Sequence, residues 1–348
     1  MYGQCGLFFR TYAGEAQLFP GRFLKCSMAL FFLVLCVIPH FMNQYLVSIL
    51  CFINIAVIGA VSLNLLTGTC GQISLGHGAF IGAGAYAAGY FSGLGLPFPL
   101  VLLLAGTITA AVGMIFGLPS LRLKGVYLAI ATLAAQLILE YVFLHWESVT
   151  GGSNGLALDP PSILGYAFDS DVKIFYLTLA AAILATLAVK NLMRTKYGRA
   201  FTAIRDHHLS AEIVGVDLFG YKLRAFGVSS FLAGVAGALW ASYAMYITPE
   251  QFGMGLSISY LAMIIIGGMG SVQGAVFGAV FITLLPEGLN FAAQHAGEAF
   301  ADISGSLLAM KEGVFGLVLT LFLIFEPEGL ANRWRLVKAY WKLYPFAH

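Results

Sequence analysis

Charged residues are scarce in this sequence. Lysine, arginine, aspartate and glutamate make up only 10% of its 348 residues, whereas hydrophobic residues make up 59%. A soluble domain usually has about a quarter of its residues charged. With a mean hydropathy of +0.87, a chain of this length has too much apolar surface to bury in water, so we expect lipid to be its solvent. The composition therefore argues against an ordinary soluble globular protein.

Several motifs of catalysis and nucleotide binding are also missing. No lysine directly follows a glycine, so the chain has no GxxxxGK[ST] phosphate-binding loop, and it has no HExxH zinc motif. The five cysteines show no CxxC spacing and are interpreted as apolar thiols. His207 and His208 are adjacent and point to different helix faces, which is a poor arrangement for a metal. We therefore predict neither an enzyme nor a metal site.

Long apolar runs predict an all-α, polytopic transmembrane bundle of about 8 to 10 spans. Two of the spans, 72–92 and 256–269, are short and rich in glycine, so either is open to being re-entrant or broken. The expected spans lie near residues 27–42, 45–66, 72–92, 98–118, 124–145, 173–192, 222–246, 256–269, 272–290 and 313–326.

The distribution of basic residues predicts the orientation. If the chain starts in the cytoplasm and crosses at each span, 16 of its 18 lysines and arginines lie inside, and only Lys173 and Lys311 lie outside. The chain then divides into an N-terminal cytoplasmic or interfacial segment (1–26), a transmembrane domain (27–330) with a cytoplasmic loop at 193–221, and a cytoplasmic C-terminal tail (331–348).

Glycines in the apolar runs recur at four-residue spacing, which lets helices pack closely. The simpler interpretation of His77, which lies among them, is a buried and hydrogen-bonded structural histidine. Glu140 is the one acidic candidate for an ion site within a span. The predicted helix-packing or translocation-path residues are Gly71, Gly76, His77, Gly78, Gly82, Gly270, Gly274 and Gly278.

The segment from Gly198 to Gly220 is unusually polar for this chain. Residues 199–214 have the periodicity of an amphipathic helix with a face of small and apolar residues, and Gly215 is expected to end it. Because a solvated loop has no need of such a face, we predict a docking surface for a soluble partner. Ile204 is the expected apolar anchor, and Arg205 with Asp206 is expected to fix the register.

Six stretches, in order, resemble the branched-chain amino acid (LIV-type) ABC transporter permeases. They are GQISLGHGAFIGAGAYAAG (71–89), LRLKGVYLAIATLA (121–134), TGGSNGL (150–156), GRAFTAIRDHHLSAEIVG (198–215), YKLRAFGVSSFLAGVAGAL (221–239) and GGMGSVQGAVFGA (267–279). The resemblance implies an inner-membrane importer with a second homologous permease subunit, two cytoplasmic ATPases and a periplasmic solute-binding protein. ATP is then bound by the partners, and this chain needs no cofactor of its own.

The resemblance also implies which residues transmit motion from the ATPase. They are Gly198, Arg199, Ala200, Ala203, Ile204, Arg205, Asp206, Ala211 and Gly215. The loop departs from the general importer signature of Glu-Ala-Ala followed by a spaced glycine, because here Ser210-Ala211-Glu212 precedes Gly215. The external loop containing Gly151, Gly152, Asn154 and Gly155 is rich in turn-forming residues, and its resemblance to the family motif implies gating or reception of the binding protein.

The transported solute remains open at this point. The first hypothesis is that the solute is a branched-chain or related amino acid, and the second is that the same machinery transports urea, short amides or aromatic acids. The third hypothesis is an autonomous secondary transporter or channel, which would require intramembrane acidic residues or broken helices around an ion site. A membrane-embedded enzyme is disfavoured because the chain lacks a catalytic constellation.

Overall fold

The computed structural model describes residues 26, 29, 33–120, 125–163, 166–299, 313, 316–322, 324–326 and 328–343. Its elements, in chain order, are η1 (Ile38–His40), α3 (Gln44–Leu63), the π-helix η2 (Asn64–Thr69), α4 (His77–Gly93), α5 (Phe98–Ser120), α6 (Val126–His145), α7 (Glu147–Thr150), η3 (Gly152–Asn154), β1 (Leu156–Ala157), β2 (Ser162–Ile163), β3 (Tyr166–Ala167), α8 (Asp171–Arg194), α9 (Lys196–Ile213), α10 (Leu218–Ala244), β4 (Tyr246–Ile247), η4 (Pro249–Phe252), α11 (Met254–Gly267), α12 (Val272–Ala299) and α14 (Leu330–Leu343).

Seven helices among the described residues are long and apolar enough to cross a membrane. They are Gln44–Thr69, Phe98–Leu118, Val126–His145, Asp171–Arg194, Leu218–Ala244, Pro249–Gly267 and Val272–Phe291. This confirms the predicted all-α, polytopic bundle. The expected first and last spans, 27–42 and 313–326, fall partly outside the described residues.

The glycine-rich span expected at 72–92 is interrupted. The backbone is irregular from Gly71 to Gly76, and helix α4 begins only at His77. The preceding helix α3 changes to π-helical geometry in η2 just before this break. Irregular backbone in a membrane protein is tolerated where protein or water rather than lipid surrounds it. Protein encloses part of this segment, because Gln72 and Ser74 are buried, whereas Gly71 and Ile73 are exposed.

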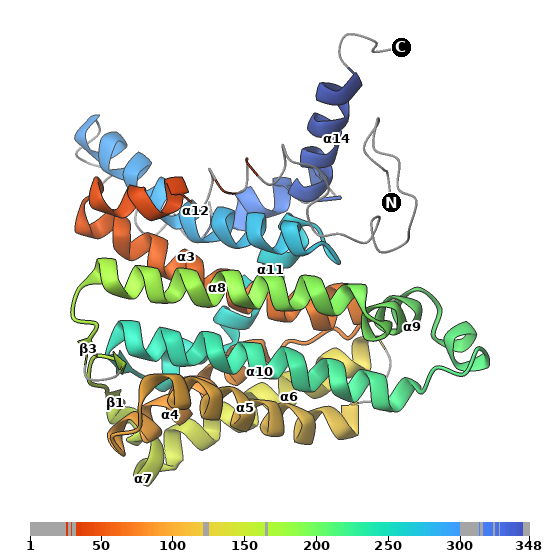
Figure 1. Cartoon of the computed structure of the whole chain (residues 1–348), viewed down its shortest axis with the longest axis horizontal. Coiled ribbons are helices and arrows are strands. Elements are labelled where there is room, and N and C mark those ends of the chain that lie inside the picture. Colours follow the sequence, from red (N-terminus) through yellow and green to blue (C-terminus); the bar gives the residue numbers. More distant parts are fainter. Residues whose placement is uncertain are drawn as a thin grey trace.

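The long helices of the bundle share one general direction, with α9 beyond one end and α7, β1 and β3 at the other (Figure 1). Helix α10 is central and packs against α3, α4 and α5. Its approach to α4 is close because both helices carry glycine at the contact. A Cβ at Gly84 would lie 2.4 Å from the Cα of Gly234, and one at Gly237 would lie 1.9 Å from the carbonyl oxygen of Ile81. Small residues thus set the separation of these helices.

Helices α11 and α12 make a second close contact. A Cβ at Gly274 would lie 2.5 Å from the carbonyl oxygen of Gly267, and one at Gly278 would lie 1.8 Å from that of Met263. Gly270, which the four-residue spacing grouped with these two, does not belong to the helix groove. It lies in the turn before α12 with φ of +80°, a conformation that favours glycine. The grouping was wrong because spacing alone does not show where the helix begins.

Candidate functional site

Helix α9 is built by local signals at both ends. The Thr195 hydroxyl accepts a hydrogen bond from the backbone nitrogen of Tyr197 (3.2 Å), which caps the start. Gly198 sits against the preceding turn, where a Cβ would lie 2.3 Å from the carbonyl oxygen of Met193. At the other end Gly215 has φ of +91°, and the backbone nitrogen of Val216 bonds the carbonyl of Ala211 at 2.9 Å. This is the pattern of a Schellman motif, so the predicted stop at Gly215 has a geometric cause.

The small and apolar face of α9 is turned toward the chain itself. Ala200, Phe201, Ile204 and Ala211 are buried within this single subunit, and α9 contacts α8, α10 and η2. The expectation that this face, anchored by Ile204, is free for a partner was therefore wrong. An amphipathic periodicity shows that one face is covered, but the covering surface is here the bundle of the same chain.

A different apolar surface of α9 is exposed. Leu209, Ile213 and Val214 expose 53%, 86% and 83% of their surface, respectively. They follow a kink at His207, where φ is −158° and ψ is 91°. We name these three residues the α9 tip. Their exposure was not predicted, because the sequence pattern does not show which apolar residues of a helix remain uncovered.

Arg205 connects α9 with the π-helix. Its Nη1 donates to the carbonyl oxygen of Gly68 (3.0 Å), and its Nε and Nη2 bond Oδ1 of the exposed Asp206. Gly71, with φ of +72°, packs against Arg205, since a Cβ there would lie 3.2 Å from Cγ of the arginine. Arg205 thus contacts the segment that leads into the break before α4, whereas we had expected its main contact to lie in a partner.

The π-helix is also joined to the turn between α11 and α12. The backbone nitrogen of Gly270 donates to Oδ1 of Asn64 (2.8 Å). Gly68 faces the same turn, because a Cβ added to Gly68 would lie 2.5 Å from the backbone nitrogen of Gly270. π-Helical turns occur frequently at functional sites. Three segments far apart in the sequence, namely α9, η2 and this turn, therefore meet at one junction.

His77 is held as a structural residue. It is buried, and its Nε2 lies 3.0 Å from the carbonyl oxygen of Gly59 and 3.1 Å from Oγ of Ser62. Tyr260 packs edge-on against its ring. Gly76 precedes His77 and lets α6 approach closely, because a Cβ added to Gly76 would lie 2.5 Å from the carbonyl oxygen of Thr132. The described geometry accordingly agrees with the simpler interpretation of this histidine.

Gly78 and Gly82 continue the same surface along α4. A Cβ at Gly78 would lie 2.9 Å from Oγ of Ser257, and one at Gly82 would lie 2.8 Å from the ring of Phe143. Both glycines thus adjoin protein groups, on α11 and α6 respectively. This close packing suits the predicted role of helix contact, while a role in a translocation path stays a prediction.

The loop at 151–155, which the sequence predicts to be external, is a set of tight turns. Gly151, Gly152 and Gly155 all have positive φ, between 61° and 72°. Asn154 accepts a hydrogen bond at its carbonyl oxygen from the hydroxyl of Tyr246 (2.5 Å), beside the antiparallel pair β1–β4. The letters GGSNG also fit the GxSxG motif, but Ser153 lies in the turn η3 and not between a strand and a helix, as a nucleophile elbow requires. The loop is therefore a series of turns that depend on glycine.

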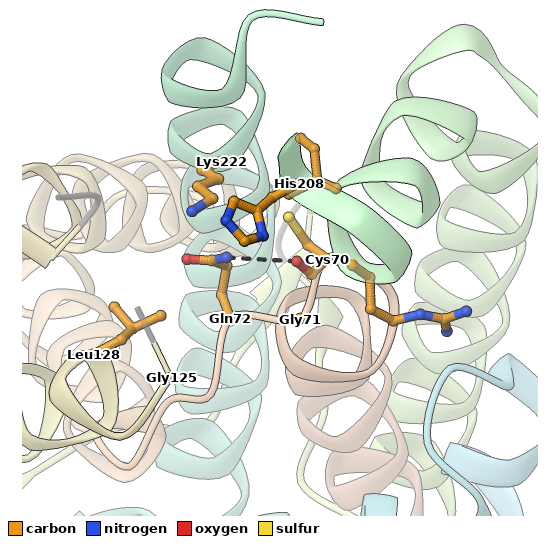
Figure 2. Close-up of a pocket in the computed structure, with 9 residues that line it drawn as sticks. Cys70, Gly71, Gln72, Gly125, Leu128, His208 and Lys222 are labelled. Carbon is orange, nitrogen blue, oxygen red and sulfur yellow. Dashed lines mark hydrogen bonds between the residues drawn. The ribbon is translucent and has the colours of Figure 1, made fainter. Parts of the chain in front are cut away.

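A pocket of about 200 Å³ lies beside the junction of α9 and η2. Figure 2 shows Lys222, His208 and Gln72 gathered around it, with Leu128 across from them. Burial raises the pKa of the Cys70 thiol to about 12, against the opposing effect of Lys222, so this thiol is neutral. The residues lining the pocket are Cys70, Gly71, Gln72, Gly125, Leu128, Ile204, Arg205, His208 and Lys222.

Three of these lining residues, Gly71, Ile204 and Arg205, were predicted as site residues, but for other reasons. Lys222 attracted notice only as one more basic residue on the inner side. The available signal was a lysine placed at the start of an apolar helix, and its burial depends on packing between distant segments. No group of three or more metal-binding side chains occurs in the part of the chain that the structure describes.

Comparison with known proteins gives consistent matches. Residues 45–323 match a family described as "Branched-chain amino acid transport system / permease component". The chain is 31% identical over 319 residues to the high-affinity branched-chain amino acid transport system permease protein LivM of Salmonella typhimurium, covering 84% of this chain and 71% of that protein. A probable LivM of Methanocaldococcus jannaschii is 26% identical over 238 residues, covering 66% and 67% respectively.

A relative that is named for a different solute also matches. The autoinducer 2 import system permease protein LsrC of Enterobacter sp. is 30% identical over 220 residues, which are 61% of this chain and 62% of that protein. No solved structure matches the chain.

Proposed function

Because this chain belongs to the family of branched-chain amino acid transport system permeases, we propose that it is one of two membrane subunits of an ATP-driven importer of branched-chain amino acids. The chain is a multi-pass membrane component of transport and not an enzyme. The observation that carries the solute assignment is the likeness to LivM over 84% of the chain.

The proposed partners are a second homologous permease, two cytoplasmic ATPases and a periplasmic binding protein. The chain lies in the inner membrane with both ends and α9 in the cytoplasm, because this orientation puts 16 of 18 basic residues inside. In this orientation the loop from Gly151 to Gly155 faces the binding protein. ATP chemistry belongs to the ATPases, since this chain has no phosphate-binding loop.

The ATPase docks on the α9 tip. Leu209, Ile213 and Val214 supply an exposed apolar surface at the end of the bundle that lies in the cytoplasm, and the exposed Asp206 flanks it with charge. Apolar side chains that become buried in a partner's pocket give most of the affinity of an interface, and neighbouring charges give specificity. The buried face with Ala200 and Ile204 instead fixes α9 to its own bundle.

Arg205 transmits movement of α9 to the solute path. Its hydrogen bond to Gly68 and its packing on Gly71 join α9 to η2 and to the irregular segment before α4. A shift of α9 on ATP binding by the partner then biases the arrangement of these segments. Such a bias requires that the partner bind the two arrangements with different affinity.

Uptake of radiolabelled L-leucine tests this function. Cells that lack the chain should lose uptake, and expression of the wild-type chain should restore it, with a requirement for the ATPase. The other solutes tested are urea, short amides and aromatic amino acids, which the sequence leaves as alternatives. Autoinducer 2 is added because the LsrC relative is named for its import. Restored uptake of one of these and not of leucine would replace the proposed solute, and uptake without any ATPase would replace the proposed machinery.

A further inference from the structure

Helix α14 is largely uncovered by its own bundle. Every residue from Arg333 to Tyr340 is exposed in this chain, and the large apolar side chains of Trp334, Leu336 and Val337 are among them. Figure 1 shows α14 toward the α9 end of the bundle, where it runs across the direction of the long helices and away from them. A group of exposed apolar side chains of this size marks a surface that contacts a protein or a membrane.

The residues of α14 separate into an apolar side and a basic side. Trp334, Val337 and Tyr340 follow one another at three-residue spacing, which places them along one side of the helix. Arg335 and Lys338 have the same spacing and lie along another side. The last 20 residues of the chain contain four basic residues and no acidic one. A helix with this division is typical of segments that lie in the membrane interface.

The charges on the basic side are not offset by acidic side chains. Arg333 forms an ion pair with Glu326, whereas neither Arg335 nor Lys338 forms one among the residues that the structure describes. Arg335 donates from Nη2 to Oδ1 of Asn332 (3.1 Å), which is a neutral amide. The ammonium group of Lys338 lies 5.3 Å from the centroid of an aromatic ring, which is also uncharged. Both side chains therefore add positive charge to this surface.

The positive charge extends to the neighbouring end of α8. The charge of Lys338 and that of Arg194 both act on Lys190 and repel it. Like charges that lie this close favour a negatively charged group beside them. The surface formed by α14 and the end of α8 therefore has a preference for an anion.

The contacts of α14 place it at the boundary of the membrane. Directly before the helix lies Gly329, where a Cβ would be 2.6 Å from the backbone nitrogen of Gly268, just after the end of α11. The ring of Trp334 lies 6.0 Å from that of Phe277, centroid to centroid. Phe277 is five residues inside the start of α12, or about 8 Å along the helix axis. Interfacial helices are buried to a similar depth, about 5–10 Å into the boundary between headgroups and acyl chains.

We propose that α14 lies in the membrane interface on the α9 side, which is the inner leaflet in the proposed orientation, and binds anionic phospholipid there. Trp334 and Val337 contact the acyl chains, and Arg335 and Lys338 contact the phosphate groups. Tryptophan and tyrosine are enriched at this level of a membrane, and anionic lipids attract basic residues near it. A soluble partner is disfavoured because the level of Trp334 lies within the span α12, which lipid surrounds.

Cysteine labelling on the two sides of α14 tests this placement. Val337→Cys puts a thiol on the apolar side, and Ala339→Cys puts one on an exposed position outside that side as the matched control. The full chain, together with its partner permease, is placed in nanodiscs of phosphatidylcholine with or without about one third phosphatidylglycerol. The rate of reaction with an uncharged maleimide is followed by mass spectrometry of the peptide that contains the new cysteine, relative to the same peptide in unfolded protein.

In discs with phosphatidylglycerol the thiol at position 337 should react at least 25-fold more slowly than in unfolded protein, whereas the thiol at 339 should react at a similar rate in both. In discs of phosphatidylcholine alone the rate at 337 should rise about 25-fold. Each basic residue near an anionic surface favours the attached helix about fivefold, and there are two of them. Equal rates at 337 and 339 would remove α14 from the interface. Equal protection at 337 in the two kinds of disc would refute the binding of anionic lipid.

Substitution of the basic side assigns the contacts. Lys338→Gln and Arg335→Gln should each speed labelling at position 337 about fivefold in discs with phosphatidylglycerol and leave it unchanged in phosphatidylcholine. Lys173→Gln is the matched control, because it removes the same charge at the other end of α8 and should leave labelling at 337 unchanged. Unchanged protection in both α14 variants, or an equal change in the Lys173 variant, would contradict the assigned contacts.

A protein that covers α14 is the alternative outcome. Coverage by the partner permease would protect position 337 equally in both kinds of disc. Coverage by the ATPase would protect it only after purified ATPase is added. Either result would overturn the proposal and make α14 a protein interface. The readout requires neither leucine uptake nor a defined orientation, because both leaflets of a disc have the same lipids, so a failure here leaves the proposed function standing.

Discussion

The α9 tip gives the sharpest test of the proposed docking of an ATPase on this chain. We consider Ile213→Ser, which removes an aliphatic side chain that is 86% exposed in the chain alone. Because the side chain has so little contact with its own bundle, the substitution should change the stability of the permease by no more than about 0.5 kcal/mol. Any large effect must then come from binding.

The magnitude follows from burial of this side chain in the partner. Fully burying an isoleucine side chain contributes about 1.5–3 kcal/mol. The Kd for the ATPase should therefore rise about 10- to 150-fold, since each 1.4 kcal/mol is about tenfold. Ile204→Ala should behave in the opposite way. Ile204 is 4% exposed, so that variant should lose about 2–5 kcal/mol of permease stability through an internal cavity.

The assay titrates purified ATPase onto the permease in nanodiscs and follows thermal unfolding of the same samples. Leu94→Ser is the matched control, because Leu94 is an exposed leucine in the turn after α4, on the side of the membrane opposite to α9 in the proposed orientation. It should bind the ATPase with wild-type Kd. An unchanged Kd for Ile213→Ser, or an equal loss for Leu94→Ser, would refute docking at the α9 tip.

Three further predictions concern packing, transmission and orientation. Gly278→Ala should lower the stability of the detergent-solubilised protein by about 1–3 kcal/mol, because the new Cβ would lie 1.8 Å from a carbonyl oxygen of α11. The control Gly288→Ala, whose Cβ has nothing within 4 Å, should have a melting temperature near that of the wild type. Equal melting temperatures for the two variants would contradict this account of the contact. Arg205→Gln should reduce leucine uptake and keep ATPase co-purification, since it removes the charge from the hydrogen bond to the π-helix and leaves the α9 tip unchanged. Loss of co-purification would instead show that Arg205 belongs to the docking surface. In intact cells an impermeant thiol reagent should label Asp159→Cys and not Asp206→Cys, and the reverse result would invert the orientation.

Much of the architecture could be predicted from the sequence because lipid imposes simple rules. Backbone groups in a bilayer must be satisfied within the segment, so apolar runs such as 98–118 and 124–145 become helices with nearly the expected bounds. Local signals worked as well. Gly215 ends α9 in a left-handed conformation, as predicted, whereas the helix begins at Lys196, a few residues before the expected start at 199. These features depend on residues close together in the sequence.

The candidate site was harder to predict because its residues come from distant segments. The amphipathic pattern of α9 correctly indicated a covered face, but pattern carries no information about what covers it. Only the packed structure puts Ile204 against its own bundle and leaves Ile213 and Val214 exposed beyond the kink. Gly270 shows the same limit, because the four-residue spacing assigned it to a helix that begins only at Val272.

Local composition, hydropathy and short motifs were enough to predict the class of the protein, most of its helices and the stretches that resemble the LIV-type permeases. That Lys222 and Gln72 share one pocket and that Arg205 reaches Gly68 became evident only from the packed structure. A polar group in a membrane helix has no preferred partner until the helices pack. Close glycine contacts between α4 and α10 and between α11 and α12 set that packing.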